Sequence, residues 1–166
     1  GRTGQILACQ TFGVKPDIVT LAKGLGGGVP IGAFLTTDKI ASAFHAGDHG
    51  TTFGGNPLAS AAGNAVLDIM AKENLPANAA AMGIYLVEEL RKLQRKYPTL
   101  IKDVRGCGLM VGMELSCPGR DIVNRCLEAG AIINCTAVTV LRFVPSLNIT
   151  QDHIDELIVI LDKVLI

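Results

Sequence analysis

The sequence lacks several features that would assign it quickly to a class of protein. Its 15 Lys and Arg residues balance 15 Asp and Glu residues, so it has no net charge to drive non-specific binding to nucleic acid or acidic membranes. No apolar run approaches the roughly 20 residues of a transmembrane helix, and the first residues do not follow the layout of a signal peptide. We therefore expect a soluble, cytoplasmic protein with no nucleic-acid or membrane partner.

Signals for metal binding or disulfides are also missing. The five cysteines are an odd number without a Cys-x-x-Cys pair, and the three histidines form no ligand pattern with them. Tryptophan is absent, and the chain does not start with methionine. We expect free, incidental thiols and no metal site. A chain of 166 residues can form a hydrophobic core without disulfides or a metal ion, because it buries roughly 70% of its unfolded surface.

Glycine is abundant, and its distribution divides the chain into two parts. Of the 19 glycines, 12 lie within residues 1–55, where helical periodicity is weak. The apolar runs at 17–22 and 31–37 predict buried strands bounded by turns, so Lys23 is expected at a strand end.

After residue 55 the pattern changes to helices and short strands. Apolar periodicity predicts helices at 56–72, 76–96, 121–129 and from 151 onward, the first of them with Asn56 as N-cap and Pro57 in the first turn. Short apolar runs predict strands at 101–105, 109–115, 131–134 and 138–143. This alternation predicts an α/β or α+β layout in two layers.

Two common nucleotide-binding motifs do not fit the glycine-rich loops. A P-loop places Gly-Lys-Ser/Thr after its glycines, whereas Lys23 precedes them. A dinucleotide fingerprint starting at Gly24 would need a glycine at Val29, and one starting at Gly106 would need a glycine at Val111. Nucleotide binding is therefore not favoured.

Lys23 stands at the end of an apolar strand and precedes a Gly-x-Gly-Gly-Gly-x-Pro-x-Gly segment. Partial desolvation there would disfavour the ammonium form and favour the free amine, which is the nucleophile for a carbonyl. Glycines allow a planar ligand to approach the backbone closely. The segment therefore suits Schiff-base chemistry with an aldehyde cofactor. The alternative is that Lys23 is an ordinary surface turn residue.

Two further segments carry groups suited to anions. Thr51 and Thr52 precede a Gly-Gly pair and the predicted helix start at Asn56, an arrangement that could hold a phosphate or could only cap the helix. Arg142 is embedded in an apolar strand, where a guanidinium requires a carboxylate partner. That partner could belong to a substrate, or to the protein in a structural salt bridge.

Taken together, these segments resemble the class III (ornithine-type) pyridoxal-phosphate aminotransferases. The resemblance covers essentially the whole chain and is carried by residues 1–4 (Gly-Arg-Thr-Gly), 16–33 around Lys23, 47–59 and 141–143. Residues 47–59 and 133–136 are most similar to members that use N-acetylornithine. The resemblance implies an α/β protein of fold type I among the pyridoxal-phosphate transferases. It implies that residues 1–75 end the large cofactor domain, linking helix included, and that 76–166 form the small α+β C-terminal domain.

The resemblance also implies a role for each candidate residue. Lys23 would form the Schiff base with pyridoxal 5′-phosphate and move a proton between the substrate Cα and the cofactor. Thr52 would bind the cofactor phosphate across a homodimer interface, so that the active site is shared. Thr51 would contact the substrate, and Arg142 would take part in recognising a substrate carboxylate.

The implied reaction transfers an amino group between small-molecule amino and keto acids. The expected donor is N-acetylornithine and the acceptor 2-oxoglutarate, giving N-acetylglutamate semialdehyde and glutamate in arginine biosynthesis; the alternatives are ornithine, succinylornithine or 4-aminobutyrate as donor. In this family an aspartate that pairs with the cofactor ring precedes the Gly-Arg-Thr-Gly segment, and it is absent here. We therefore expect the C-terminal portion of such an enzyme, with little or no activity alone. The alternative of a different class is a non-catalytic module that dimerises or packs.

Overall fold

The computed structural model describes residues 1–166 and divides them into two compact units. The first unit comprises Gly1–Thr11 and Leu75–Ile166, and the second comprises Phe12–Asn74. The chain passes from the second unit back to the first between Asn74 and Leu75, next to the domain boundary predicted at residues 75 and 76. Residues 1–11, which the prediction placed in the N-terminal part, belong to the first unit. That the parts belong to a large and a small domain stays a prediction.

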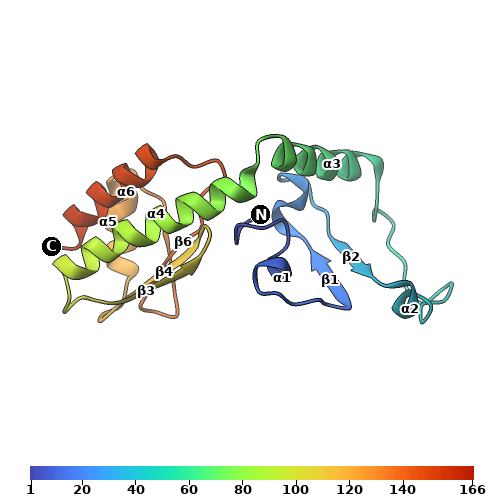
Figure 1. The fold of residues 1–166 in the computed structure, drawn as a ribbon, viewed down its shortest axis with the longest axis horizontal. Coiled ribbons are helices and arrows are strands. Elements are labelled where there is room, and N and C mark those ends of the chain that lie inside the picture. The colour runs from blue at the N-terminus through green and yellow to red at the C-terminus, as the bar shows by residue number, and fades with distance from the viewer. The chain divides into compact units, whose positions relative to one another are not determined.

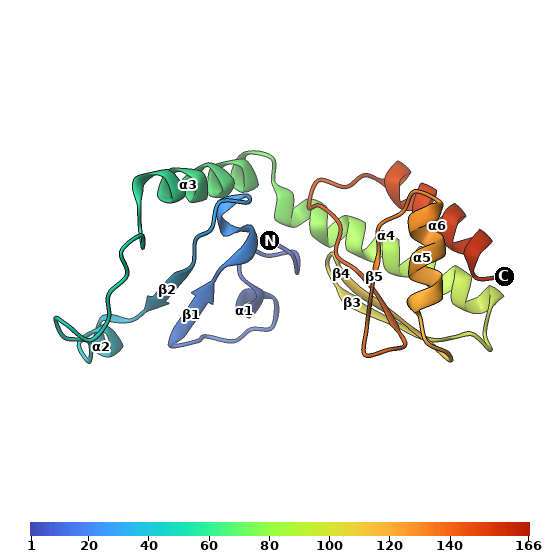
Figure 2. The same ribbon diagram turned by 180° about the vertical axis from the view of Figure 1, so that it is seen from behind.

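The first unit is a four-stranded sheet with helices on one face (Figures 1 and 2). The sheet order is β3-β4-β6-β5, and every neighbouring pair is antiparallel. The strands are β3 (Ile101–Cys107), β4 (Met110–Leu115), β5 (Asn134–Thr136) and β6 (Val140–Phe143). The helices are α1 (Ala8–Thr11), α4 (Leu75–Lys96), α5 (Arg120–Glu128) and α6 (Gln151–Val164).

The hydrophobic core of the first unit follows directly from the sequence periodicity. On α4 the buried leucines are Leu86, Leu90 and Leu93, which recur every three or four residues and form one stripe of the helix. Along β6, buried Leu141 and Phe143 alternate with partly buried Val140 and exposed Arg142, as a sheet covered on one face requires. Helices α4, α5 and α6 therefore cover the inner face of the sheet (Figure 1), and its outer face carries charged side chains.

The N-terminal segment is hydrogen-bonded to the turn between β3 and β4. The backbone amide of Leu109 donates to the Arg2 carbonyl at 3.0 Å, and the Arg2 guanidinium donates to the carbonyls of Leu109, at 3.3 Å, and Pro145. Gly108 has a φ of +53°, and a Cβ there would lie 2.9 Å from the Cα of Thr3. Only glycine therefore allows the segment to approach this closely.

The second unit holds a two-stranded antiparallel sheet, two short helices and one long helix. Its elements are β1 (Ile18–Leu21), the 3-10 helix η1 (Lys23–Gly26), β2 (Ala33–Thr36), α2 (Asp38–Ala41) and α3 (Pro57–Lys72). The predicted start of α3 is confirmed, because the Asn56 side chain accepts a hydrogen bond from the Ala59 amide at 3.0 Å and Pro57 is the first helical residue.

The prediction that residues 17–22 and 31–37 are buried strands is wrong on burial. Both segments contain strands, but Ile18 and Phe34 are 46% and 50% exposed. Within the second unit the only buried residues are Gly26, Ala59 and Gly63, which are all small. A two-stranded sheet offers too little surface for a core unless a further layer packs on it. The second unit therefore has no hydrophobic core of its own.

The predicted strands at 131–134 and 138–143 are also displaced. The first begins only at Asn134 and the second at Val140. Between them, Ala137 and Val138 have φ angles of +48° and +67°, which form a turn rather than a strand. The shift arises because neither residue type normally signals a left-handed backbone.

Some remaining expectations concern chemistry rather than packing. All five cysteines are free thiols. No three His, Cys, Asp or Glu side chains gather where they could share a metal ion. None of the helices combines the length and hydropathy needed to cross a bilayer.

Helices α4 and α6 are joined by a hydrogen bond whose strength depends on pH. The Tyr85 hydroxyl donates to Asp155 Oδ1 at 2.6 Å, and this bond raises the pKa of Tyr85 to about 12. A raised pKa means that the bond stabilises the fold below the ordinary tyrosine pKa near 10, and that this contribution is lost as pH rises through about 12.

We predict that the raised pKa of Tyr85 can be measured in a variant in which Tyr85 is the only tyrosine. Tyr97→Phe leaves Tyr85 as the only tyrosine, since the chain has two. Tyrosinate absorbance in this variant should have its midpoint at about 12, and adding Asp155→Ala should lower the midpoint toward 10 because the acceptor is gone. Equal midpoints with and without Asp155 would contradict the assignment.

Candidate functional site

Lys23 lies where the sequence predicts it, just beyond the end of β1. It is the first residue of η1, has a φ of +57°, and follows Ala22, which is extended. The expected desolvation of its amine is wrong for this chain, because the side chain is exposed and the second unit has no core to cover it. The amine makes no ion pair or hydrogen bond within the chain, so it is free to meet a ligand.

Two glycines of the loop after Lys23 have a structural reason to be glycine. Gly26 is buried, and a Cβ there would lie 2.8 Å from Ile31 Cγ2. Gly27 ends η1 with a φ of +60°, the left-handed conformation that glycine adopts without strain. These two positions fix the path of the chain directly after the lysine.

The two threonines lie on the loop that leads into α3. Thr51 lines a pocket of about 340 Å³ with residues from the Pro30–Gly32 turn and the start of α3. The hydroxyls of Thr51 and Thr52 are exposed and have no hydrogen-bond partner within the chain. Because Asn56 provides the cap of α3, the capping alternative does not account for the threonines.

The exposed groups of the second unit fit a phosphorylated aldehyde. An aldehyde carbon needs a free amine, which Lys23 offers, and a phosphate needs several hydrogen-bond donors. Two threonine hydroxyls and the backbone amides at the start of α3 are donors of this kind, and α3 has 16 residues, long enough for a helix dipole. Lys23 itself does not line the 340 Å³ pocket, so the chain supplies these groups without enclosing them.

Arg142 belongs to the first unit and lies on β6. Its side chain is exposed on the outer face of the sheet and makes no ion pair or hydrogen bond within the chain. The structural salt bridge considered as an alternative is therefore absent. Arg142 also lines a mainly apolar pocket of about 450 Å³, together with residues of α4, β5, β6 and α6. A guanidinium without a protein partner can bind the carboxylate of a small molecule.

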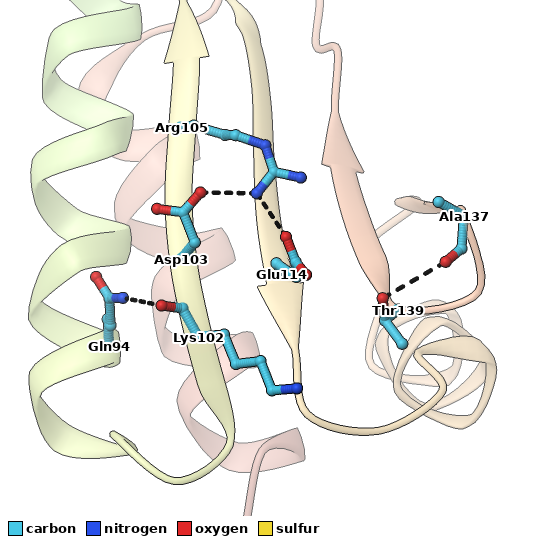
Figure 3. A network of polar contacts seen from close by, with 7 residues as sticks. All are labelled: Gln94, Lys102, Asp103, Arg105, Glu114, Ala137 and Thr139. Carbon is cyan, nitrogen blue, oxygen red and sulfur yellow. Dashed lines mark hydrogen bonds and ion pairs between the residues drawn. The ribbon is translucent and has the colours of Figure 1, made fainter.

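One polar cluster was not singled out by the sequence analysis. Arg105 Nη1 lies 2.7 Å from Asp103 Oδ2 and 2.7 Å from Glu114 Oε2, on the outer face of the first unit's sheet (Figure 3). Both carboxylates raise the pKa of Arg105, chiefly through these hydrogen bonds. The spacing of Asp103 and Arg105 indicates a shared face, but only the strand pairing brings Glu114 beside them.

This chain is similar to proteins that are named as aminotransferases. The family described as "Aminotransferase class-III" matches residues 1–165. The acetylornithine aminotransferase of Methanocaldococcus jannaschii is 51% identical over 164 residues, which cover 99% of this chain and 41% of that protein.

Two solved structures extend the similarity to the fold. The ornithine aminotransferase of Plasmodium yoelii has a TM-score of 0.93 at 35% identity, with 99% of this chain and 44% of that chain covered. A PLP-bound amine transaminase from an uncultivated Pseudomonas species has a TM-score of 0.90 at 34% identity, with 99% and 41% covered. The chain thus spans less than half the length of these relatives.

Proposed function

This chain belongs to the class-III aminotransferase family, and on that premise we propose that its protein transfers amino groups between small amino and keto acids with the help of pyridoxal phosphate. The family match confirms the predicted family and fold type I. Members of the family depend on pyridoxal phosphate, which, when bound, supplies an electron sink for the Cα–H bond of the substrate. The observation that carries the proposal is the free Lys23 amine at the start of a glycine-rich loop.

Lys23 is proposed to hold the cofactor and to move the proton. Its Nζ has no partner within the chain, so an amine is available for the cofactor aldehyde. With the cofactor bound, the Lys23 Nζ would be the group that accepts the substrate Cα proton and returns it to a carbon of the cofactor. General acid–base catalysis of this kind needs a group within hydrogen-bond reach of the proton.

Thr52 is proposed to bind the cofactor phosphate, and Thr51 to contact the substrate. Their free hydroxyls lie ahead of α3, whose first amides favour an anion. We further propose that Thr52 serves the active site of a second subunit in a homodimer. A shared site is consistent with this loop, because its threonine hydroxyls have no hydrogen-bond partner within their own chain.

Arg142 is proposed to recognise a substrate carboxylate. Its guanidinium is exposed and unpaired, and a carboxylate can accept two parallel hydrogen bonds from it.

For the amino donor we propose N-acetylornithine, with 2-oxoglutarate as acceptor. The support is the 51% identity to a relative that is named an acetylornithine aminotransferase. Ornithine is the second candidate, because the structure with a TM-score of 0.93 is an ornithine aminotransferase. Succinylornithine and 4-aminobutyrate remain alternatives of the same reaction class.

A chimeric enzyme tests the donor assignment. The part of the Methanocaldococcus jannaschii relative that this chain does not match would be fused ahead of residue 1, and glutamate formation from 2-oxoglutarate would be measured with each donor. We expect kcat/KM for N-acetylornithine to exceed that for ornithine by at least about tenfold, a difference of about 1.4 kcal/mol in transition-state binding. A preference for ornithine would overturn the donor assignment.

For the 166 residues taken alone, the second candidate function is a non-catalytic packing module. The specific observation is that the second unit exposes Phe12, Phe34 and Phe53 and has no core. The isolated chain should then form dimers or larger species in sedimentation velocity without showing transamination. Measurable transamination by the isolated chain would contradict this reading.

A further inference from the structure

The outer face of the first unit's sheet carries a row of residues that crosses all four strands. Arg105 on β3 pairs with Gly112 on β4, Gly112 pairs with Arg142 on β6, and Arg142 pairs with Asn134 on β5. Residues that pair across an antiparallel sheet point to the same face. Arg105 and Arg142 therefore lie on one face, separated by a glycine that has no side chain.

The next row on the same face brings a carboxylate between the two arginines. Glu114 on β4 pairs with Asp103 on β3 and with Val140 on β6. It is thus a diagonal neighbour of both Arg105 and Arg142. Diagonal neighbours in an antiparallel pair lie about 7–8 Å apart, within reach of long side chains. By position alone, Glu114 could pair with either guanidinium.

The structure shows which arginine Glu114 contacts. Its Oε2 lies 2.7 Å from Arg105 Nη1, and the same nitrogen also contacts Asp103 (Figure 3). Arg142 has no ion pair. Arg105 and Glu114 are 52% and 37% exposed, so this choice rests on small free-energy differences that one substitution can reverse.

We propose that Arg105 is a positioning residue that holds Glu114 away from Arg142 and so keeps the Arg142 guanidinium free for a ligand carboxylate. That this ligand is a substrate rests on the proposed function. Asp103 assists by contacting the same Arg105 nitrogen, which fixes the guanidinium over β3 and β4. Gly112, between the two arginines, has no side chain, and a Cβ there would lie 3.2 Å from Val140 Cγ1, so any larger residue would crowd this row.

The test follows the Arg142 side chain directly in the 166-residue chain. The Nε–Hε resonance of Arg142 would be assigned by nitrogen-15 NMR and compared in the unsubstituted chain, Arg105→Gln, Arg105→Lys, and Arg105→Gln with Glu114→Gln. In Arg105→Gln we expect the resonance to shift, because Glu114 turns to Arg142. In Arg105→Lys, and in the double variant, we expect it to stay at its original position, because Glu114 is still held or no longer charged.

A carboxylate titration then separates the inference from the proposed function. With glutarate as the probe, we expect the dissociation constant at Arg142 to rise about twofold to fivefold in Arg105→Gln and to recover in the double variant, as the free energy of one exposed ion pair allows. An Arg142 resonance that does not move in Arg105→Gln overturns the inference. A resonance that moves as expected supports it, and if glutarate then has no effect on the unsubstituted chain, the assignment of Arg142 to a substrate carboxylate is what fails.

Discussion

Gly83→Leu is expected to destabilise the first unit by more than about 3 kcal/mol, the upper range of overpacking in a protein core. Gly83 is buried on the face of α4 that meets the turn between β3 and β4. A Cβ at this position would lie 2.6 Å from the Cα of Gly108. Leucine has a higher helix propensity than glycine by roughly 1 kcal/mol, so any loss comes from the contact. Since Gly108 is itself fixed by a φ of +53°, the turn cannot easily move away.

Tyrosine fluorescence makes this measurement specific to the first unit. Both tyrosines, Tyr85 and Tyr97, belong to the first unit, and the chain has no tryptophan. Urea unfolding followed by this signal should give a much lower midpoint for Gly83→Leu, an intermediate one for Gly83→Ala, and little change for Ala81→Leu on the exposed side of α4. Equal midpoints for Gly83→Leu and Ala81→Leu would show that the close contact does not exist.

Lys23→Ala is expected to lower the transamination rate of the chimeric enzyme by at least about 10³-fold, because losing a positioned proton-transfer group alone costs about 10²–10⁴. Lys23→Arg should be equally inactive. Arginine keeps the positive charge, but its guanidinium stays protonated and does not act as a nucleophile. The effect should appear in the single-turnover rate constant of the chemical step rather than in substrate affinity.

The matched control for Lys23 is another exposed lysine of the second unit. Lys39→Ala on α2 removes the same charge from the same unit and should leave the rate within about twofold of the unsubstituted enzyme, as surface substitutions usually change little. If Lys39→Ala and Lys23→Ala lowered the rate equally, the loss would reflect stability and not chemistry.

Local signals in the sequence were sufficient for much of the fold. Asn56 and Pro57 mark the start of α3 because capping depends on neighbouring residues only. The stripe of leucines on α4 gives both the helix and its buried face. By contrast, the turn at Ala137 and Val138 was missed, since their left-handed backbone is imposed by strand pairing and not by residue type.

Burial and cross-strand contacts could not be predicted from the sequence. The apolar runs around Ile18 and Phe34 look like buried strands, but burial depends on a covering layer that the second unit does not contain. Lys23 was placed at the correct strand end, yet its exposure follows from the same missing layer. The contact of Arg105 with Glu114 needs the register of β3 and β4, which residue spacing alone does not determine.

The position of the cofactor attachment tests the central claim most directly. The chimeric enzyme would be saturated with pyridoxal phosphate and reduced with borohydride, which makes the link to a lysine permanent, and its peptides would be mapped by mass spectrometry. At saturation the account predicts one pyridoxyl group per chain, on Lys23. At a limiting cofactor concentration it predicts less label on Lys23 in Thr52→Val than in the unsubstituted enzyme, because the proposed phosphate contact is gone. A label on another lysine, or one spread over several surface lysines, would contradict it.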